Sequence, residues 1–97
     1  MNTKDRSGLL AATSHFPAHA AEIEAMMQSD EDFRGLCGDL AEAEGALVGS
    51  QRLPEPVREE RRLECRSWID GLSAEIEAAL RQKKVISIAG ARRKPAI

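Results

Sequence analysis

The stretch DEDFRGLCGDLAEAEGAL, residues 30–47, carries the strongest indication of the fold in this chain. Within it and just before it, large apolar residues recur every seven positions, at Met26, Phe33, Leu40 and Leu47. Such a heptad spacing is typical of a helix that packs along a second helix at a shallow angle. The stretch therefore predicts a long helix with one apolar seam.

The segment before this stretch predicts a separate helical piece. Residues 17–28 are rich in Ala, Glu and Met, and Pro17 suits the first position of a helix, where its missing N–H costs nothing. Ser29 and Asp30 then offer a fresh N-cap, followed by acidic residues that favour the positive end of the helix dipole. We therefore expect the first arm to be broken or kinked near Ser29.

A second long helix is predicted from about Val57 to Lys83, after a loop over residues 49–56 that contains Pro54 and Pro56. Two helices joined by a short loop form an antiparallel hairpin. The predicted fold is thus all-α, an antiparallel two-helix hairpin with a kinked or broken first arm. Its coiled-coil-like seam is expected to comprise Ile23, Phe33, Leu36, Leu40, Leu47, Ile69, Leu72, Ile76 and Leu80.

Charge divides the 97 residues unevenly. Residues 1–80 carry 8 basic and 16 acidic side chains, a net charge of −8, whereas residues 81–97 carry 6 basic and no acidic ones. We expect a flexible arm over residues 1–14, a hairpin domain over residues 15–83, and a basic, disordered tail over residues 84–97. Within the tail, Val85–Ile88 is β-prone and is an alternative contact, as a strand added to a partner's sheet.

The arrangement resembles the YdcH-like family, short bacterial helical hairpins of unknown function. The resemblance covers about residues 15–80 and is carried by Phe16-Pro17, Ile23, Asp30-x-x-Phe33-x-x-Leu36 and Arg62-Leu63-x-Cys65-Arg66-x-x-Ile69. It implies a hairpin fold with a tendency to associate, and no catalytic residue. The chain departs from the family where Cys65 replaces a leucine and Arg66-Ser67 replaces a Lys-Asp pair.

Composition and spacing argue against an enzyme. We find no nucleophile–base pair, no phosphate-binding glycine loop and no carboxylate dyad in the sequence, and we expect no cofactor. His15 and His19 have the spacing of a helical metal pair, but Pro17 lies between them, so we expect exposed histidines and no metal. Cys37 and Cys65 are expected to be buried, reduced thiols, with a disulfide or half of a metal site as the alternatives left open.

The sequence also lacks a run of about 20 apolar residues and an N-terminal export signal, so we expect a cytoplasmic protein without a membrane span. Of its 41 hydrophobic residues 15 are Ala, which predicts a thin core. We therefore expect a homo-oligomer or a complex with a larger protein.

Two functions are consistent with these sequence features. The first is a small non-enzymatic interaction protein, an adaptor, accessory subunit or regulator, with Trp68 as its best contact residue. The competing interpretation of Trp68 is that it covers the flank of its own hairpin. The second function is a nucleic-acid-associated regulator that contacts phosphates through Arg92, Arg93 and Lys94. A further arginine cluster on residues 58–66 is expected to pair with neighbouring acids rather than with phosphates.

Overall fold

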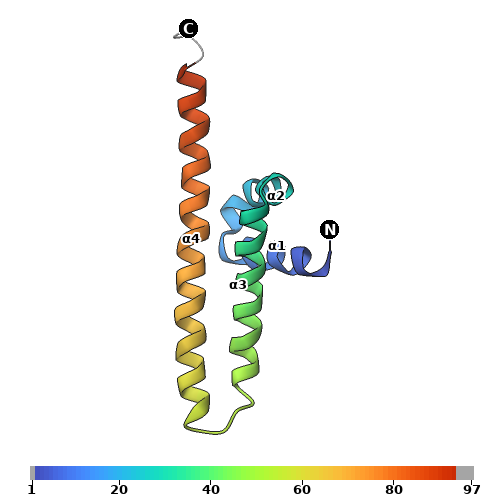
Figure 1. Ribbon diagram of the computed structural model, residues 1–97, viewed down its shortest axis with the longest axis vertical. Helices are drawn as coiled ribbons and strands as arrows, with labels where there is room; N and C mark the ends of the chain where they lie inside the picture. Colours follow the sequence, from blue (N-terminus) through green and yellow to red (C-terminus); the bar gives the residue numbers. More distant parts are fainter. Residues whose placement is uncertain (1, 94–97) are drawn as a thin grey trace.

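The chain is a bundle of four α-helices that pack together, without a strand in any residue described (Figure 1). The computed structural model describes the backbone of residues 2–93 and the side chains of residues 2–82. The elements are α1 (Thr3–His15), the 3₁₀ turn η1 (Pro17–His19), α2 (Ala20–Ser29), α3 (Glu31–Ser50) and α4 (Val57–Arg93).

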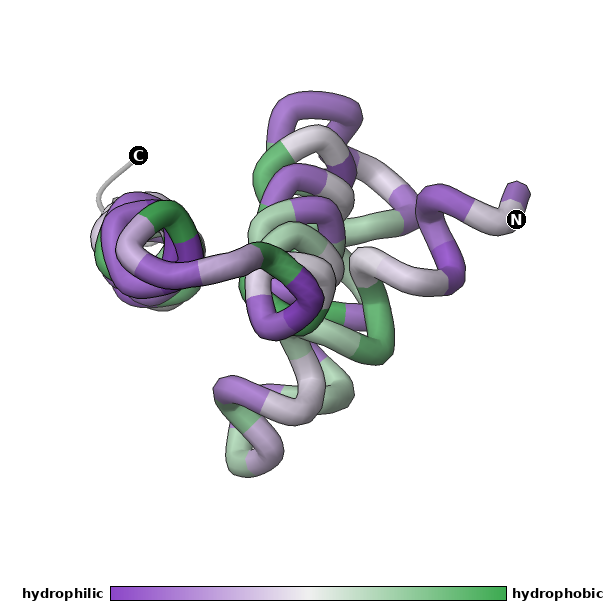
Figure 2. Tube along the Cα trace, turned by 90° about the horizontal axis from the view of Figure 1, so that it is seen from below, coloured by the Kyte–Doolittle hydropathy of each residue, from purple (hydrophilic) through white to green (hydrophobic). Residues whose placement is uncertain are grey.

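Helix α3 lies between α1 and α4 and contacts both. Helix α4 runs back alongside α3 after the turn at the bottom of Figure 1, whereas α1 crosses the other side of α3. Seen from below, α4 is viewed end-on beside α3, and the N-terminus lies on the far side (Figure 2). The resulting molecule is elongated, with principal extents of 64 × 25 × 21 Å.

The boundary between α2 and α3 falls at Asp30, as its N-capping chemistry requires. The Asp30 side chain accepts a hydrogen bond of 3.0 Å from the backbone N–H of Phe33, and its own backbone is extended. On the α2 side, Arg34 Nη1 donates a hydrogen bond of 2.8 Å to the carbonyl of Met27. One carboxylate and one guanidinium thus fix the corner that the sequence predicts near Ser29.

The core follows the predicted seam and extends beyond it. Seven of the nine predicted seam residues are buried, and the other two, Leu36 and Leu47, are partly buried against the same cluster. Two further core residues, Met26 and Cys37, were expected from the heptad repeat and as a buried thiol. The residues that the prediction omitted are short or flexible ones of α1, α2 and α3: Ala11, Ala12, Met27 and Ala43. Glycine at position 8 brings α1 close to α3, because a Cβ there would lie 2.8 Å from the backbone nitrogen of Gly38.

The prediction of a flexible arm over residues 1–14 is wrong, because α1 occupies this segment. The Asn2 side chain caps α1 by accepting a hydrogen bond of 2.8 Å from the Asp5 N–H. Gly8, Ala11 and Ala12 are buried in the helix. Their small size lets α1 pack closely on α3, which a search for large apolar residues does not detect.

The predicted domain end at residue 83 and the basic tail over residues 84–97 also need correction. Helix α4 continues through Arg93, so the β-prone run Val85–Ile88 is helical. The physical reason is that β propensity is weak on its own and needs a neighbouring strand, whereas here the preceding helix continues. Residues 94–97 lie outside the described part of the chain.

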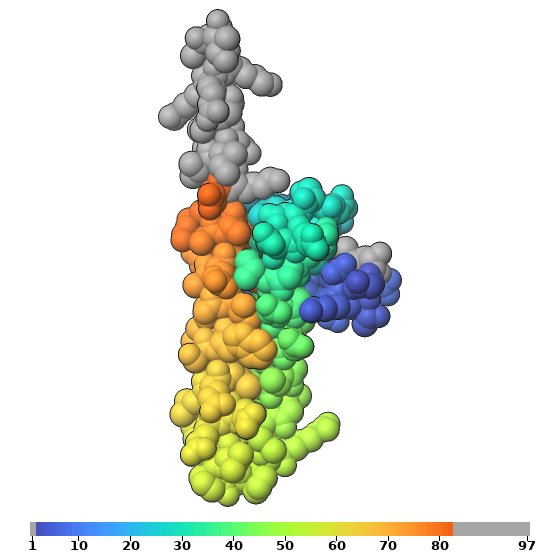
Figure 3. Space-filling view, in the orientation of Figure 1, coloured from blue at the N-terminus to red at the C-terminus, as the bar shows by residue number. Residues whose placement is uncertain are grey.

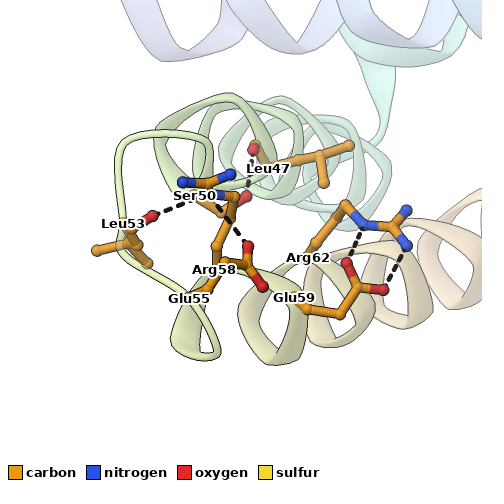
Figure 4. A network of polar contacts seen from close by, with 7 residues as sticks. All are labelled: Leu47, Ser50, Leu53, Glu55, Arg58, Glu59 and Arg62. Atoms are coloured by element: carbon orange, nitrogen blue, oxygen red, sulfur yellow. Dashed lines mark hydrogen bonds and ion pairs between the residues drawn. The ribbon is translucent and has the colours of Figure 1, made fainter.

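The turn between α3 and α4 is closed by short-range polar contacts (Figure 4). The buried hydroxyl of Ser50 donates a hydrogen bond of 2.6 Å to the carbonyl of Leu47, and Arg58 Nε donates one of 2.9 Å to the carbonyl of Leu53. These contacts satisfy carbonyls near the end of α3 and in the turn, where the regular helical pattern stops. The first orders the last turn of α3, and the second joins the first turn of α4 to the loop.

Candidate interaction surface

Among residues 2–82, five large apolar side chains are substantially exposed. The exposed fractions are Leu10 64%, Val48 62%, Leu63 56%, Trp68 42% and Val57 41%. Three of these residues lie on α4, whose buried side chains already face the rest of the molecule. Helix α4 therefore carries apolar surface on faces that the fold does not cover.

Trp68 lies on the flank of α4 next to the buried seam. Its exposed neighbours on the same side of α4 are Glu64 and Gly71, four and three residues away, and Arg61 and Glu75, seven residues away on either side. We call these four residues with Trp68 the Trp68 face. A Cβ added at Gly71 would meet no atom within 4 Å. The surface beside the indole ring is therefore open.

The Trp68 face points away from η1 and α2. Glu77 follows Trp68 by nine residues, and at 3.6 residues per turn it lies about half a turn around α4. Glu77 lines a cleft together with residues of η1 and α2. The N-terminal helices therefore leave the Trp68 face uncovered, and in Figure 3 they lie against the upper part of α3.

The structure does not bring Trp68 together with the other predicted contact residues. Arg92 and Arg93 lie in the last turn of α4, so their backbones are about 36 Å or more from Trp68 at 1.5 Å per residue. Their side chains lie outside the described residues, as does the whole of Lys94. Trp68 and the basic end are thus two separate candidate surfaces.

Three of the four arginines at the start of α4, namely Arg58, Arg61 and Arg62, lie near acids of the same segment, whereas Arg66 makes no ion pair among residues 2–82. Arg58 lies 3.3 Å from Glu55, and Arg62 donates hydrogen bonds of 2.7 and 3.1 Å to the two carboxylate oxygens of Glu59. These bonds hold the pKa of Glu59 below its usual value. The pairs match the expected ion pairing rather than a row of arginines free for phosphate.

The two histidines point to different partners. His15 ends α1 and its Nε2 lies 2.7 Å from a carboxylate oxygen of Glu44 on α3, whereas His19 Nδ1 lies 3.3 Å from Glu22. The first contact joins two helices, and the second stays within one turn. Among residues 2–82, no group of three or more His, Cys, Asp or Glu side chains is placed to hold a metal ion.

Both cysteines are buried and free, Cys37 in α3 at 0% exposure and Cys65 in α4 at 4%. Burial raises the pKa of the Cys37 thiol to about 11. A thiol with so high a pKa holds little thiolate at neutral pH and reacts slowly. The structure therefore matches the expectation of two buried thiols rather than a disulfide.

A shallow cleft of about 320 Å³ lies between α4 and the η1–α2 corner. Its lining is Phe16, His19, Glu22, Glu77, Leu80 and Arg81. Each wall carries its own polar pair, His19 with Glu22 and Glu77 with Arg81, the latter at 3.0 Å. Sequence reasoning missed this cleft because it forms only when the 3₁₀ turn places Phe16 opposite α4.

Comparisons with protein-family models, with curated proteins and with solved structures found no match to this chain. No helix among the described residues is both long and apolar enough to cross a membrane.

Proposed function

We propose that this chain is a small non-enzymatic interaction protein that works by docking its helices on another protein surface, either a second copy of itself or a larger protein. In this proposal α3 and α4 act as an antiparallel two-helix hairpin with a coiled-coil-like seam, and α1 and α2 brace it. The resemblance to the YdcH-like hairpins supports the same fold and the same tendency to associate. The free thiols of Cys37 and Cys65 suit a reducing compartment such as the cytoplasm.

The observation that carries the proposal is the uncovered apolar surface of α4. Trp68 and Val57, which lie 11 residues apart and so on one side of α4, are each more than two fifths exposed, on a helix whose other face already packs in the core. Large aromatic side chains at such positions are enriched among residues that dominate binding energy. An exposed tryptophan beside an open glycine is therefore the feature that a partner surface fits best.

The experiment uses three tagged baits, the wild type, W68A and L63A, each incubated with lysate of the host with and without nuclease. Proteins recovered in stoichiometric amounts, including untagged copies of the chain, are quantified. Recovery that survives nuclease, falls with W68A and persists with L63A supports the proposal. If recovery of the partner is unchanged with W68A, Trp68 is not a contact residue for that partner.

A second candidate function is supported by the charge of the C-terminal segment. Residues 81–97 carry six basic side chains and no acidic one, and α4 continues through Arg93. A helix end of this composition suits phosphate contacts by Arg92, Arg93 and Lys94, with strong salt dependence. Loss of recovery on nuclease treatment, and loss of nucleic-acid binding when residues 83–97 are removed, would favour this function over the first.

A further inference from the structure

Within the Trp68 face, the stripe formed by Arg61, Trp68 and Glu75 has a charge pattern that is complementary to itself. Arg61 precedes Trp68 by seven residues and Glu75 follows it by seven. Seven residues make nearly two turns of an α-helix, so these three side chains lie along one stripe of α4. The stripe therefore reads positive, aromatic, negative, with equal spacing on either side of the indole.

All three side chains are accessible. The side chain of Arg61 is 56% exposed, Trp68 is 42% exposed, and Glu75 is also exposed. Arg61 has a loose contact of 3.6 Å with Glu64, which is longer than a hydrogen bond. Glu75 makes no ion pair with any side chain of residues 2–82. Both charges are thus available to a partner at small cost.

The orientation of a second copy follows from this pattern. When two α4 helices lie antiparallel with a two-fold axis at Trp68, Arg61 of each copy lies opposite Glu75 of the other. A parallel arrangement in register would place Arg61 opposite Arg61 and Glu75 opposite Glu75, which repel. A two-fold interface uses the same patch on both subunits, so a stripe complementary to itself is what it requires.

The indole rings also fit this arrangement. Gly71 follows Trp68 by about one turn and offers open space, since no atom lies within 4 Å of a Cβ built there. In the antiparallel pair, the second copy's indole approaches this space from across the axis. The exposed apolar surface of Trp68 is then buried against the other indole instead of remaining in contact with water.

We propose that the Trp68 face binds the same face of a second copy, with the two α4 helices antiparallel and Arg61 of each copy paired with Glu75 of the other. This inference rests on the proposed function, because it names the partner and the surface of the docking event. It commits to the second copy because the complementary charges lie on one and the same stripe. The test below distinguishes this self-pairing from the binding of a larger protein to the Trp68 face.

Charge reversal tests this pairing. In R61E the stripe is acidic at both ends, and in E75R it is basic at both ends, so each variant alone should dimerise at least about tenfold more weakly than the wild type. Mixing the two variants restores opposite charges across the axis, and so does the double variant R61E/E75R. Sedimentation equilibrium of each variant, of the mixture and of the double variant measures the dissociation constants.

The controls carry the same charge changes on another face of α4. Arg66 and Asp70 each lie two residues from Trp68, and so about 160° around the helix, and both are exposed. R66E and D70R should dimerise like the wild type, and far-ultraviolet circular dichroism should show helix in every variant. W68A should weaken the dimer at least as much as either reversal, and L63A should not.

The inference is overturned if the wild type sediments as a monomer at its highest soluble concentration. It is also overturned if R61E and E75R dimerise as well as R66E and D70R, or if their mixture does not recover. A monomeric wild type that still captures a stoichiometric protein through Trp68 refutes the self-pairing and leaves the proposed function standing. A dimer that W68A does not weaken refutes both the pairing and the role of Trp68.

Discussion

Gly8 of α1 lies against the backbone of Gly38 of α3 where the two helices cross, and no room is left there for a side chain at position 8. A Cβ built on Gly8 would lie 2.8 Å from the Gly38 nitrogen and 2.9 Å from the Cys37 carbonyl carbon. A Cβ built on Gly38 would instead meet the side chain of Lys4, with Cε at 2.9 Å. The first obstacle is backbone, and the second is the far end of a flexible side chain.

Substitution of Gly8 by Ala should therefore destabilise the chain, because α1 must move away from α3. We expect the free energy of unfolding to fall by about 2 kcal/mol or more in a urea titration. G35A and G45A are the matched controls, since a Cβ at either position meets nothing within 4 Å. Each should raise the stability by up to about 1 kcal/mol through helix propensity. A G8A protein as stable as G35A would contradict the close crossing.

Asp30 should contribute to stability through its cap at the start of α3. D30A removes the acceptor for the Phe33 N–H and should lower the free energy of unfolding by about 1 kcal/mol. D30N keeps an acceptor oxygen in the same place and should retain most of that stability. Equal losses in D30A and D30N, measured by urea unfolding, would show that the charge rather than the cap matters.

The contact between His15 and Glu44 should couple α1 to α3. Both side chains are partly exposed, at 29% and 39%, so we expect a coupling energy of roughly 0.5 kcal/mol in a double-mutant cycle of H15A and E44A. The pair His19 and Glu22 offers a comparison, because its contact of 3.3 Å lies within one turn. A cycle on His19 and Glu22 that gives the larger coupling would argue against an interhelical role for His15.

Cys37 should make stability depend on pH in the alkaline range. Burial raises the pKa of its thiol from about 9 to about 11, so above pH 9 the unfolded chain holds fewer protons than the folded one. The stabilising contribution is fully present below pH 9 and is lost as pH rises through about 11, by up to about 1.4 kcal/mol per pH unit. The measurement compares urea unfolding of the wild type and C37A across this range.

C37A loses packing at every pH, but it should lose the part of the alkaline slope that the thiol supplies. The chain has no tyrosine to add its own titration in that range. At neutral pH, alkylation of Cys37 in the folded protein should be slow, because the thiolate is the reacting form. Identical slopes for C37A and the wild type would contradict the assignment.

The sequence predicted those helices whose large apolar residues recur at a regular spacing or whose ends carry a capping residue or a proline. The heptad of Phe33, Leu40 and Leu47 and the cap at Asp30 led to α3 directly, and the loop prolines led to the start of α4 at Val57. These signals are local and depend on large side chains or on special backbone chemistry. For that reason the predicted seam and the buried core largely coincide.

Helix α1 was missed because its packing relies on small residues. Gly8, Ala11 and Ala12 bury little apolar area each, so they form no recognisable stripe, and Gly8 packs directly on the backbone of Cys37 and Gly38. The cleft beside Phe16 depends in the same way on a tertiary arrangement. The candidate contact Trp68 was identified from its type and place, but its uncovered state required the positions of η1 and α2.

The most direct test of the central claim is the fluorescence of Trp68, measured as the protein is diluted from about 100 µM to about 0.1 µM, a range that spans typical dissociation constants of weak dimers. Trp68 is the only tryptophan, and the chain has no tyrosine, so the emission reports on this one side chain. We expect the emission maximum to shift to longer wavelength on dilution, as the indole returns to water. R61E and E75R should each show the long-wavelength maximum at every concentration, and their mixture should show the shorter one. An emission maximum that stays constant over the whole range, in a chain that sediments as a monomer, would contradict it.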